Sequence, residues 1–325
     1  MGNKISEFLG DIVVGSKESS FPLPKLPPHA VKNVLLTMDF IDLISFSLIS
    51  NSTKRLVTSV KMRAVLLDIN IRDHLLIEVY WFYNMRFDIY LQCAEWIGVR
   101  PSIQGDIQIG GFRWKLKKNY ELKDWLEHFR TIFSRKYDKI LFLPESARFE
   151  ISTLEDTIGD LSSALVEISS DCDSAHVQEI HRNLHSVEEV LLTANPYEDL
   201  VDFQRFLTRN FRGFMFDWAF NPTLEDLLVS NAKILCVKGA LSGGIINQFL
   251  KLWVKGGNRR MKYLFIYFPV GEHPKMAHIL KDIHYKFYGR QRDLIKIDRK
   301  SGSSAVLCTR IVEGFVTLMF IVPED

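Results

Sequence analysis

The sequence predicts a mixed α+β / α/β protein whose 325 residues are organised in successive parts. Three short helical patterns follow a proline-rich lead, a stretch of alternating apolar residues comes next, and an apolar-x-apolar element then recurs between helical patterns. We therefore expect a flexible N-terminus at 1–20, a three-helix domain at 21–60, a β-rich connecting or capping segment at 61–118, and an irregular α/β solenoid at 119–325.

The composition is that of a globular protein, with 47% hydrophobic and 25% charged residues. A net charge of +2 gives no overall attraction to nucleic acid or membrane. No apolar run approaches the roughly 18 residues that a membrane-spanning helix requires. The four cysteines lack the spacing of a zinc site or a disulfide framework and read as free thiols. We expect a soluble intracellular protein, cytoplasmic and/or nuclear.

The N-terminal domain begins after four prolines between Phe21 and Pro28, a stretch that excludes helix. Apolar residues then recur at helical spacing over 29–38, Asp39 can cap a second helix over 40–49, and Ser50 or Ser52 can cap a third over 53–60. The second helix is apolar almost all round, and three short helices cannot bury it alone. We expect a partner protein, rather than the rest of the chain, to cover it.

The next segment alternates apolar and other residues, which predicts strands. These strands are expected at 65–71, 75–81, 87–96 and 112–116, with a turn at Arg72-Asp73 between the first two. A helix over 120–132 follows, because its large apolar residues lie at helical spacing.

Apolar pairs then recur along the remaining chain. The pairs are Leu141/Leu143, Val166/Ile168, Val190/Leu192, Phe214/Phe216, Leu235/Val237 and Leu264/Ile266. Their spacing of about 20–29 residues, with helical patterns between them, is typical of a leucine-rich-repeat-like solenoid with one strand per repeat. A regular asparagine ladder is missing, so the solenoid is expected to be irregular.

In such a solenoid each pair points into the core, and the residue between its members points to the opposite, concave face. The candidate substrate-binding residues on that face are Phe142, Glu167, Leu191, Met215, Cys236 and Phe265. Four of them are large and apolar, which on an exposed sheet face would form a binding patch. The alternative is that another segment, such as the C-terminal hairpin, already covers this face.

Charge is distributed unevenly along the chain. Residues 144–203 hold fourteen acids and two bases, whereas residues 251–310 hold fourteen bases and four acids. Such blocks can orient a partner, or attract one another within one domain. The basic block could instead contact RNA, but it lacks the interleaved aromatic residues of single-strand binders.

Motifs that would indicate catalysis are missing. There is no phosphate-binding loop, no GxSxG and no HExxH. His181 and His185 are one helical turn apart, with His176 nearby, but Arg182 stands where a metalloprotease has glutamate, so we interpret all three as solvated helix histidines. We expect no metal, no cofactor and no enzymatic activity. Gly2 fits the short pattern for N-myristoylation, which alone would anchor the chain only weakly and without membrane insertion.

Two stretches resemble a known family. Residues 21–27, 34–38, 41–50 and 53–57 resemble an F-box, in particular that of the large nematode group with a type 2 F-box-associated domain. Residues 223–228, 232–237, 247–256 and 261–266 resemble the associated domain, and 298–311 its terminal hairpin. Pro28 and Asn51-Ser52 depart from the commoner F-box residues.

The resemblance implies a substrate-recognition subunit of a Skp–cullin–F-box ubiquitin ligase. Its F-box would bind a Skp-type adaptor, and through it a cullin, while the solenoid holds an unidentified protein target. The adaptor-binding residues would be Leu26, Pro27, Val31, Leu35, Met38, Asp42, Leu43, Phe46 and Ile49. Two other functions stay open: an F-box interaction scaffold that recruits no target for degradation, and an RNA-binding solenoid.

Overall fold

The computed structural model describes residues 26–61, 66–80, 85–93, 96–103, 107–108, 112–115, 122–133, 139–158, 164–239, 241–288, 294–312 and 314–323. The expected flexible N-terminus and Gly2 lie outside these residues. The chain divides into two compact units. Unit 1 comprises Met1–Leu67 and Leu76–Tyr137, and unit 2 comprises Asp68–Leu75 and Asp138–Asp325.

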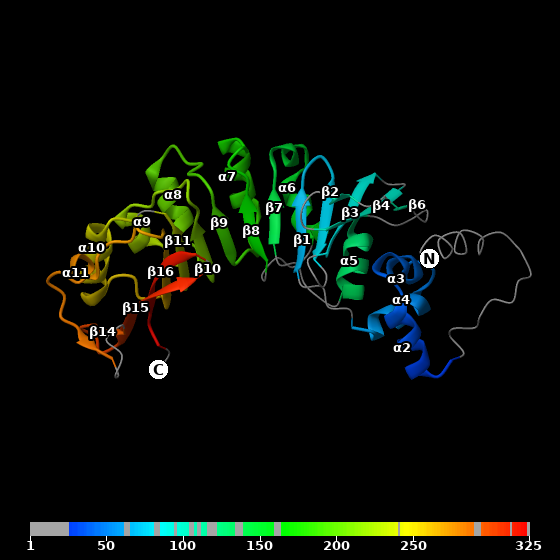
Figure 1. Ribbon diagram of the computed structural model, residues 1–325. Coiled ribbons are helices and arrows are strands. Elements are labelled where there is room, and N and C mark those ends of the chain that lie inside the picture. Colours follow the sequence, from blue (N-terminus) through cyan, green and yellow to red (C-terminus); the bar gives the residue numbers. More distant parts are fainter. Residues whose placement is uncertain are drawn as a thin grey trace, which may run out of the picture. The chain divides into compact units, whose positions relative to one another are not determined.

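Unit 1 contains the predicted three helices, in blue in Figure 1: α2 (Pro28–Thr37), α3 (Phe40–Ser47) and α4 (Asn51–Ser59). Their starts follow from local chemistry. Proline occupies the first turn of α2, the Asp39 carboxylate accepts the amide of Asp42 at the start of α3, and Ser50 forms a capping box with Thr53 at the start of α4. The predicted order of the three helices is confirmed, and so are the predicted caps by Asp39 and Ser50.

The rest of unit 1 consists of helix α5 (Leu122–Phe133) and the strands β2 (Leu75–Tyr80), β3 (Met85–Cys93), β4 (Trp96–Ile103), β5 (Ile107–Gln108) and β6 (Phe112–Lys115). The strand order is β2-β3-β4-β5, and β6 also pairs with β4. The β3–β4 pairing is antiparallel. A single strand over 87–96 was therefore a wrong prediction, because β3 ends at Cys93 and β4 begins at Trp96.

The chain itself covers one side of the all-round apolar helix α3, whereas Phe46 on the same helix stays half-buried. This corrects the expectation that a partner protein, rather than the rest of the chain, would cover it. Phe40 stacks on Phe87 of β3 and Phe133 of α5, with ring centroids 3.9 and 5.7 Å apart. The Ser47 hydroxyl hydrogen-bonds His128 Nε2 of α5 at 2.9 Å. The F-box helices, α5 and β3 thus form one core.

Unit 2 is built on a mixed sheet. Its strands are β1 (Leu66–Ile71), β7 (Lys139–Phe142), β8 (Leu165–Ile168), β9 (Glu189–Leu192), β10 (Gly213–Phe216), β11 (Ile234–Lys238), β12 (Tyr263–Pro269), β13 (Lys286–Phe287), β14 (Ile295–Asp298), β15 (Ser304–Val312) and β16 (Phe315–Ile321). Strands β1, β7, β8, β9, β10, β11 and β12 lie side by side in that order and are parallel.

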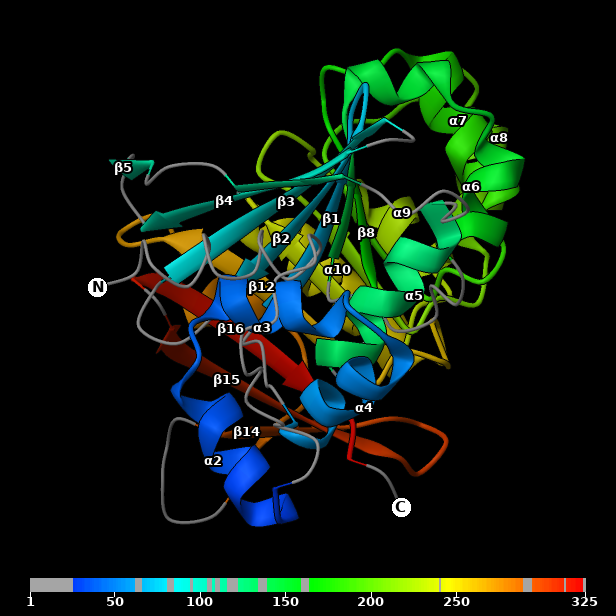
Figure 2. The ribbon, with the colours of Figure 1, turned by 90° about the vertical axis from the view of Figure 1, so that its right-hand side faces the viewer.

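Short helices connect these parallel strands. They are α6 (Ile151–Ile158), α7 (Ser174–Asn183), α8 (Leu200–Leu207), α9 (Leu224–Val229) and α10 (Gly243–Val254), with the 3-10 turn η3 (Pro144–Arg148) before α6 and α11 (Met276–Ile279) after β12. Figures 1 and 2 show α6–α10 along one face of the strands. An Asp, Ser or Thr side chain caps α7, α8, α9 and α10, so each connection turns sharply into its helix.

The strand residues that face these helices form the core of unit 2. One row consists of Ile140, Val166, Val190, Phe214, Leu235 and Leu264, all at most 3% exposed. Five of the six predicted inward pairs are confirmed. The first is wrong by one residue, since Ile140 and Phe142 are buried and Leu141 lies on the other face. Ile140–Phe142 is itself apolar throughout, so alternation alone could not fix which residues face inward.

The C-terminal hairpins extend the sheet at its edge. Strand β16 pairs antiparallel with β12, β15 pairs with β16, and β14 pairs with β15. Gly302 and Gly314 adopt positive φ angles of 99° and 81° at the two turns, a conformation that favours glycine. Strand β16 adds to β12 edge to edge and so extends the sheet, and its Phe315 packs against Trp218, just after β10, with ring centroids 5.2 Å apart.

Candidate recognition surfaces

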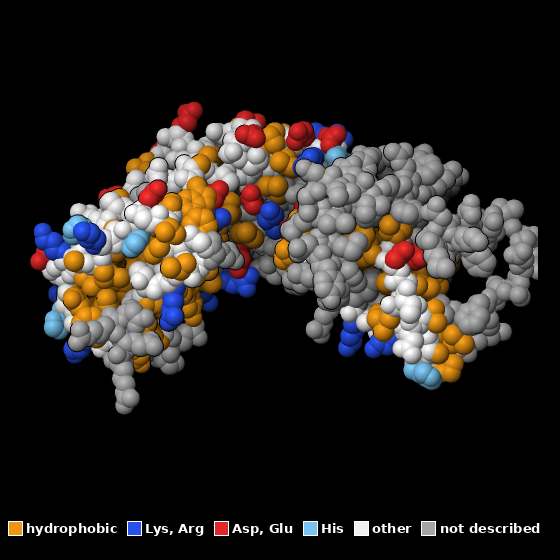
Figure 3. Space-filling view, in the orientation of Figure 1, with side chains coloured by type: hydrophobic (Ala, Val, Ile, Leu, Met, Phe, Trp, Pro, Cys, Tyr) orange, Lys and Arg blue, Asp and Glu red, His pale blue; other side chains and the backbone are white. Residues whose placement is uncertain are grey.

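Two surfaces hold the residues that the sequence predicts for adaptor and target binding, and both carry accessible apolar side chains. The first lies on the F-box helices, where hydrophobic side chains reach the surface in Figure 3. Leu36 is 59% exposed and Ile49 is 46% exposed. Pro27 is exposed, whereas Leu26, Met38, Asp42 and Phe46 are half-buried. These residues can contact another protein without unfolding of unit 1.

Three of the expected adaptor-binding residues lie elsewhere. Val31, Leu35 and Leu43 are 4%, 0% and 5% exposed. They face the interior of unit 1, so their contribution is to the F-box core and they are not surface contacts. The sequence analysis missed Leu36 because it lies outside the apolar stripe of α2. Helical spacing identifies the residues of a buried stripe and does not identify exposed apolar residues.

His128 lies beneath this surface. Burial first, and the nearby Lys54 ammonium second, lower the pKa of its imidazole to about 4. The Ser47 hydroxyl donates to the Ile44 carbonyl at 2.6 Å, so His128 Nε2 donates to the Ser47 oxygen in the link between α3 and α5. The buried Nδ1 atom has no hydrogen-bond partner among the described residues and is left unprotonated in the neutral ring.

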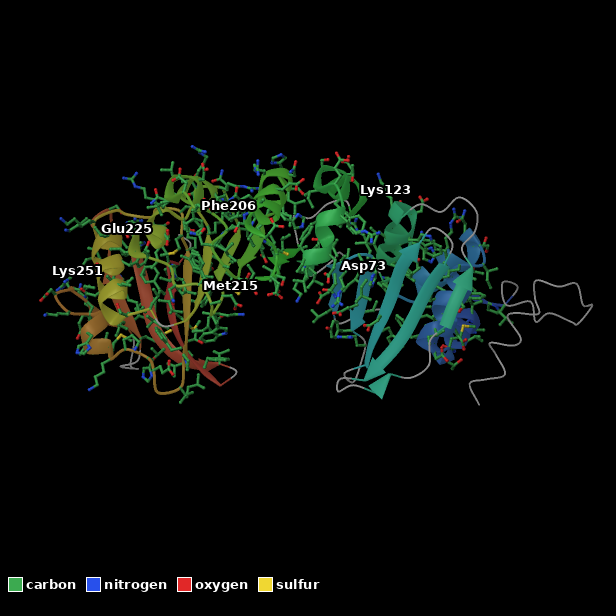
Figure 4. The ribbon with its side chains drawn as sticks, turned by 90° about the horizontal axis from the view of Figure 1, so that it is seen from above. Asp73, Lys123, Phe206, Met215, Glu225 and Lys251 are labelled. Atoms are coloured by element: carbon green, nitrogen blue, oxygen red, sulfur yellow. The ribbon has the colours of Figure 1, made fainter. Side chains whose placement is uncertain are left out.

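The second surface is the sheet face of unit 2 that α6–α10 leave uncovered. Hydrogen-bonded register aligns one residue from each strand across it, in the order Asn70, Leu141, Glu167, Leu191, Met215, Cys236, Phe265 and Met319. We call this row the open-face row. Figure 4 shows Met215 on the side of the strands away from α8, which carries Phe206. Leu141, Met215, Cys236 and Phe265 are half-buried, with none of these helices above them.

Charged side chains on this face pair across neighbouring strands. Lys139 Nζ lies 3.4 Å from Glu167 Oε2, Arg212 Nη2 lies 2.6 Å from Glu189 Oε1, and Lys238 Nζ lies 3.4 Å from Asp217 Oδ1. Each partly exposed pair contributes little to stability, but it neutralises local charge. The apolar members of the open-face row therefore lie among compensated charges.

The structure places five of the six predicted substrate-binding residues in the open-face row. They are Glu167, Leu191, Met215, Cys236 and Phe265. Phe142 is the exception: it is 0% exposed and faces the helices, and Leu141 takes its place in the row. Leu191 is only 6% exposed, so it offers less contact area than its neighbours. Burial raises the pKa of the Cys236 thiol to about 11, which makes it an apolar contact and not a nucleophile.

The interpretation of the helix histidines as solvated was wrong for two of them. His176 and His181 are 5% and 6% exposed. His176 Nε2 hydrogen-bonds the buried Ser146 hydroxyl at 2.8 Å, and His181 stacks on Phe206 at 4.0 Å. His185 is exposed, as expected. Within the described ranges no group of three or more metal-ligating side chains could hold an ion.

Comparisons with known proteins find matches in both the N-terminal and the C-terminal part of the chain. The family model described as "F-box domain" matches residues 23–64, and the model described as "F-box associated" matches residues 202–266, from α8 to β12. The "F-box associated domain-containing protein sdz-33" of Caenorhabditis elegans is 21% identical over 252 residues, covering 76% of this chain and 78% of that protein. No solved structure matches the chain.

The chain is an F-box protein with a C-terminal F-box-associated domain, as the resemblance in its sequence indicated. The F-box match covers α2–α4, and the associated-domain match covers α8–β12 on the sheet of unit 2. Among the residues with described structure, no helix is both long and apolar enough to cross a membrane.

Proposed function

We propose that this protein is a non-catalytic substrate-recognition subunit of a Skp–cullin–F-box ubiquitin ligase, acting in the cytoplasm and/or the nucleus. Its F-box binds a Skp-type adaptor, and the open-face row of unit 2 binds a protein target. Its contribution to the reaction is proximity, because it holds the target near ubiquitin-transfer chemistry performed by other subunits. The matched F-box model is the main support for this proposal.

The adaptor would contact the accessible apolar residues of the F-box. Leu36, Met38, Phe46 and Ile49 leave apolar area in water although unit 1 has a complete core without them. Burial of apolar area is favourable by about 25 cal/mol per Å², so covering these side chains would supply binding free energy without a change of fold. Asp42 and Pro27 would lie at the edge of this contact.

The target would contact unit 2, whose parallel strands and connecting helices we propose form an irregular leucine-rich-repeat-like solenoid. Strand-helix units recur about every 25 residues and each strand contributes one residue to the open-face row. Half-exposed apolar side chains flanked by paired charges are the composition of a protein-binding patch with a polar rim. This row is the observation that supports target binding by unit 2.

Co-expression with a Skp-type adaptor tests the first half of the proposal. A Phe46→Asp, Ile49→Asp double variant should fold but no longer co-purify with the adaptor. Ile311→Asp is the matched control, since Ile311 is 77% exposed on β15 in unit 2 and should not affect the complex. If the double variant folds and still co-purifies, the F-box surface is not the adaptor site.

Ubiquitination of a co-purified target tests the second half. A target that is modified by the reconstituted ligase, and that is released by Met215→Asp, would support substrate recognition by the open-face row. Adaptor binding together with unmodified binding partners would favour the interaction scaffold instead.

A further inference from the structure

A recessed site lies on the helix side of unit 2, between α7 and α8. Side chains one helical turn apart on each helix, together with a tyrosine from the β9–α8 connection, enclose a cavity of about 490 Å³. We call it the α7–α8 pocket. Its lining residues are Gln178, His181, Arg182, His185, Tyr197, Asp202, Arg205, Phe206 and Arg209. The volume is typical of sites for small molecules or single side chains.

The pocket is positively charged within an acidic part of the sequence. Three arginines line it, Arg182, Arg205 and Arg209, against the single carboxylate of Asp202. Residues 144–203 contain only two basic residues, Arg148 and Arg182, and one of those two lines the pocket. Arg205 and Arg209 lie beyond this acidic block, and the excess of three cations over one carboxylate in the lining favours a bound anion.

One arginine is rigidly positioned. Arg209 donates from Nη1 to the His181 carbonyl at 2.7 Å and from Nη2 to the Leu184 carbonyl at 2.9 Å. Its guanidinium also lies over the rings of Phe206 and Phe211, at 5.6 and 5.1 Å. Arg209 therefore supplies a fixed positive charge at the base of the pocket.

The other two arginines retain donors for a ligand. Arg182 donates from Nε to the Gln178 carbonyl at 3.2 Å, and its terminal amino groups have no hydrogen-bond partner among the described residues. Arg205 contacts Asp202 through Nη1 at 2.7 Å while its side chain is 74% exposed. A planar guanidinium with free terminal amino groups can bind two oxygens of one phosphate or carboxylate.

Tyr197 can add a neutral donor. Its hydroxyl lies 3.1 Å from His181 Nδ1, and the His181 Nε2 atom is buried with no partner among the described residues. Burial first, and Arg209 second, lower the pKa of His181 to about 3, so the ring is neutral. An unpaired buried N–H is rarer than an unpaired acceptor, which favours the tautomer protonated at Nδ1. His181 then donates to the tyrosine oxygen, and the Tyr197 proton is available to a ligand.

Electrostatics at Tyr197 supports this assignment. Burial raises the pKa of the Tyr197 hydroxyl to about 12, while Arg209 and Arg182 oppose that rise. Arg182 of α7 and Arg209, just beyond the end of α8, therefore both favour negative charge beside the tyrosine oxygen, whereas Asp202 opposes it.

We propose that the α7–α8 pocket binds a phosphate group. The net charge of the lining arginines and aspartate matches a dianion, and donors from α7, α8 and the Tyr197 loop approach from several directions, as a tetrahedral group with three terminal oxygens requires. The cavity is also larger than a phosphate alone, so it accommodates a group to which the phosphate is attached. This site is separate from the adaptor surface and the open-face row, and does not depend on the ligase proposal.

Calorimetric titration of the full chain, in chloride buffer at constant ionic strength, tests this site. The probes are inorganic phosphate, a Gly-phosphoserine-Gly peptide and the unphosphorylated peptide. We expect saturable binding of a phosphate probe and none of the unphosphorylated peptide. Arg182→Gln should weaken binding at least tenfold, and Tyr197→Phe should weaken it severalfold. Arg148→Gln, which removes the same charge from the same acidic segment, should change it less than twofold.

The two phosphate probes distinguish the source of the ligand. Tighter binding of the phosphopeptide would assign the pocket to a phosphorylated protein, and equal or tighter binding of inorganic phosphate to a small phosphate compound. The proposal is overturned if neither probe saturates the wild-type protein, or if Arg148→Gln weakens binding as much as Arg182→Gln. Thermal unfolding of each variant verifies that it remains folded.

Discussion

Substitution of the adjacent residues Leu141 and Phe142 tests which side of β7 faces the helices. The register of β1, β7 and β8 places Phe142 beside Ile71 and Ile168, both of which are nearly fully buried. Leu141 lies on the opposite face and is half-buried. Phe142→Ala should therefore destabilise unit 2 strongly, whereas Leu141→Ala should do so weakly.

The magnitudes follow from burial. Phe142 is 0% exposed, and removing a fully buried phenyl ring from a core costs about 3–5 kcal/mol, since the transfer free energy is lost and a cavity remains. Leu141 keeps part of its side chain in water, so its truncation should cost about 1 kcal/mol. The expected difference between the variants is about 2–4 kcal/mol.

Urea denaturation measures the two free energies of unfolding, and hydrogen exchange read by mass spectrometry assigns the loss to β7–β9. Ile140→Ala is a control that should resemble Phe142→Ala, because Ile140 is also fully buried. If Leu141→Ala costs as much as Phe142→Ala, the orientation described for β7 is wrong. The sequence-based prediction that Leu141 and Leu143 face the helices would then be correct.

Further predictions concern both units. Unfolded histidine has a pKa near 6.5, whereas buried His128 is protonated only near pH 4, so between these pH values the unfolded chain binds a proton that the folded chain does not. The free energy of unfolding of unit 1 should therefore decrease as the pH is lowered from about 6.5 to about 4, by up to about 1.4 kcal/mol per pH unit. His128→Gln should flatten that dependence in denaturation curves measured at several pH values. Asn247→Ala should lower the free energy of unfolding by about 2–3 kcal/mol, because its amide donates to two carbonyls at 2.8 Å, and Asn247→Asp should not rescue it. Ser50→Ala should cost about 1 kcal/mol of thermal stability through loss of the α4 cap, and Ser50→Asp should restore most of it. Leu43→Asp should unfold unit 1, seen as lost near-ultraviolet circular dichroism, and a folded variant would contradict the assignment of Leu43 to the core.

Local features of the fold were predictable because local chemistry specifies them. Proline at the start of α2, Asp39 before α3 and Ser50 before α4 determine three helix starts whatever surrounds them. The apolar pairs also predicted which side of β8–β12 is buried. In most of these strands a polar or smaller residue stands between the two members of the pair or next to them. β7 lacks that contrast, and the inward face there depends on pairing with β1 and β8, which sequence spacing does not record.

The candidate sites were less predictable, because they depend on which surfaces the chain covers. The all-round apolar pattern of α3 gave no indication of which side α5 and β3 would cover and which side would stay accessible to an adaptor. The α7–α8 pocket combines residues from Gln178 to Arg209, and their convergence requires the packing of two helices on neighbouring strands. An arginine within an acidic segment was the one available signal, and it was visible at Arg182.

The geometry of the open-face row also predicts how a target would contact it. Neighbouring strands lie about 4.8 Å apart, so the six residues from Leu141 to Phe265 form a line about 24 Å long, which an extended segment of about seven residues could follow. Met215 and Phe265 are separated by two strands, or about 10 Å, a distance at which substitutions act independently. A target that lies along the row should therefore lose binding free energy additively in the Met215→Ala, Phe265→Ala double variant. A target that binds at one end would be insensitive to one of the two substitutions, and titration of all three variants with the same target distinguishes these arrangements.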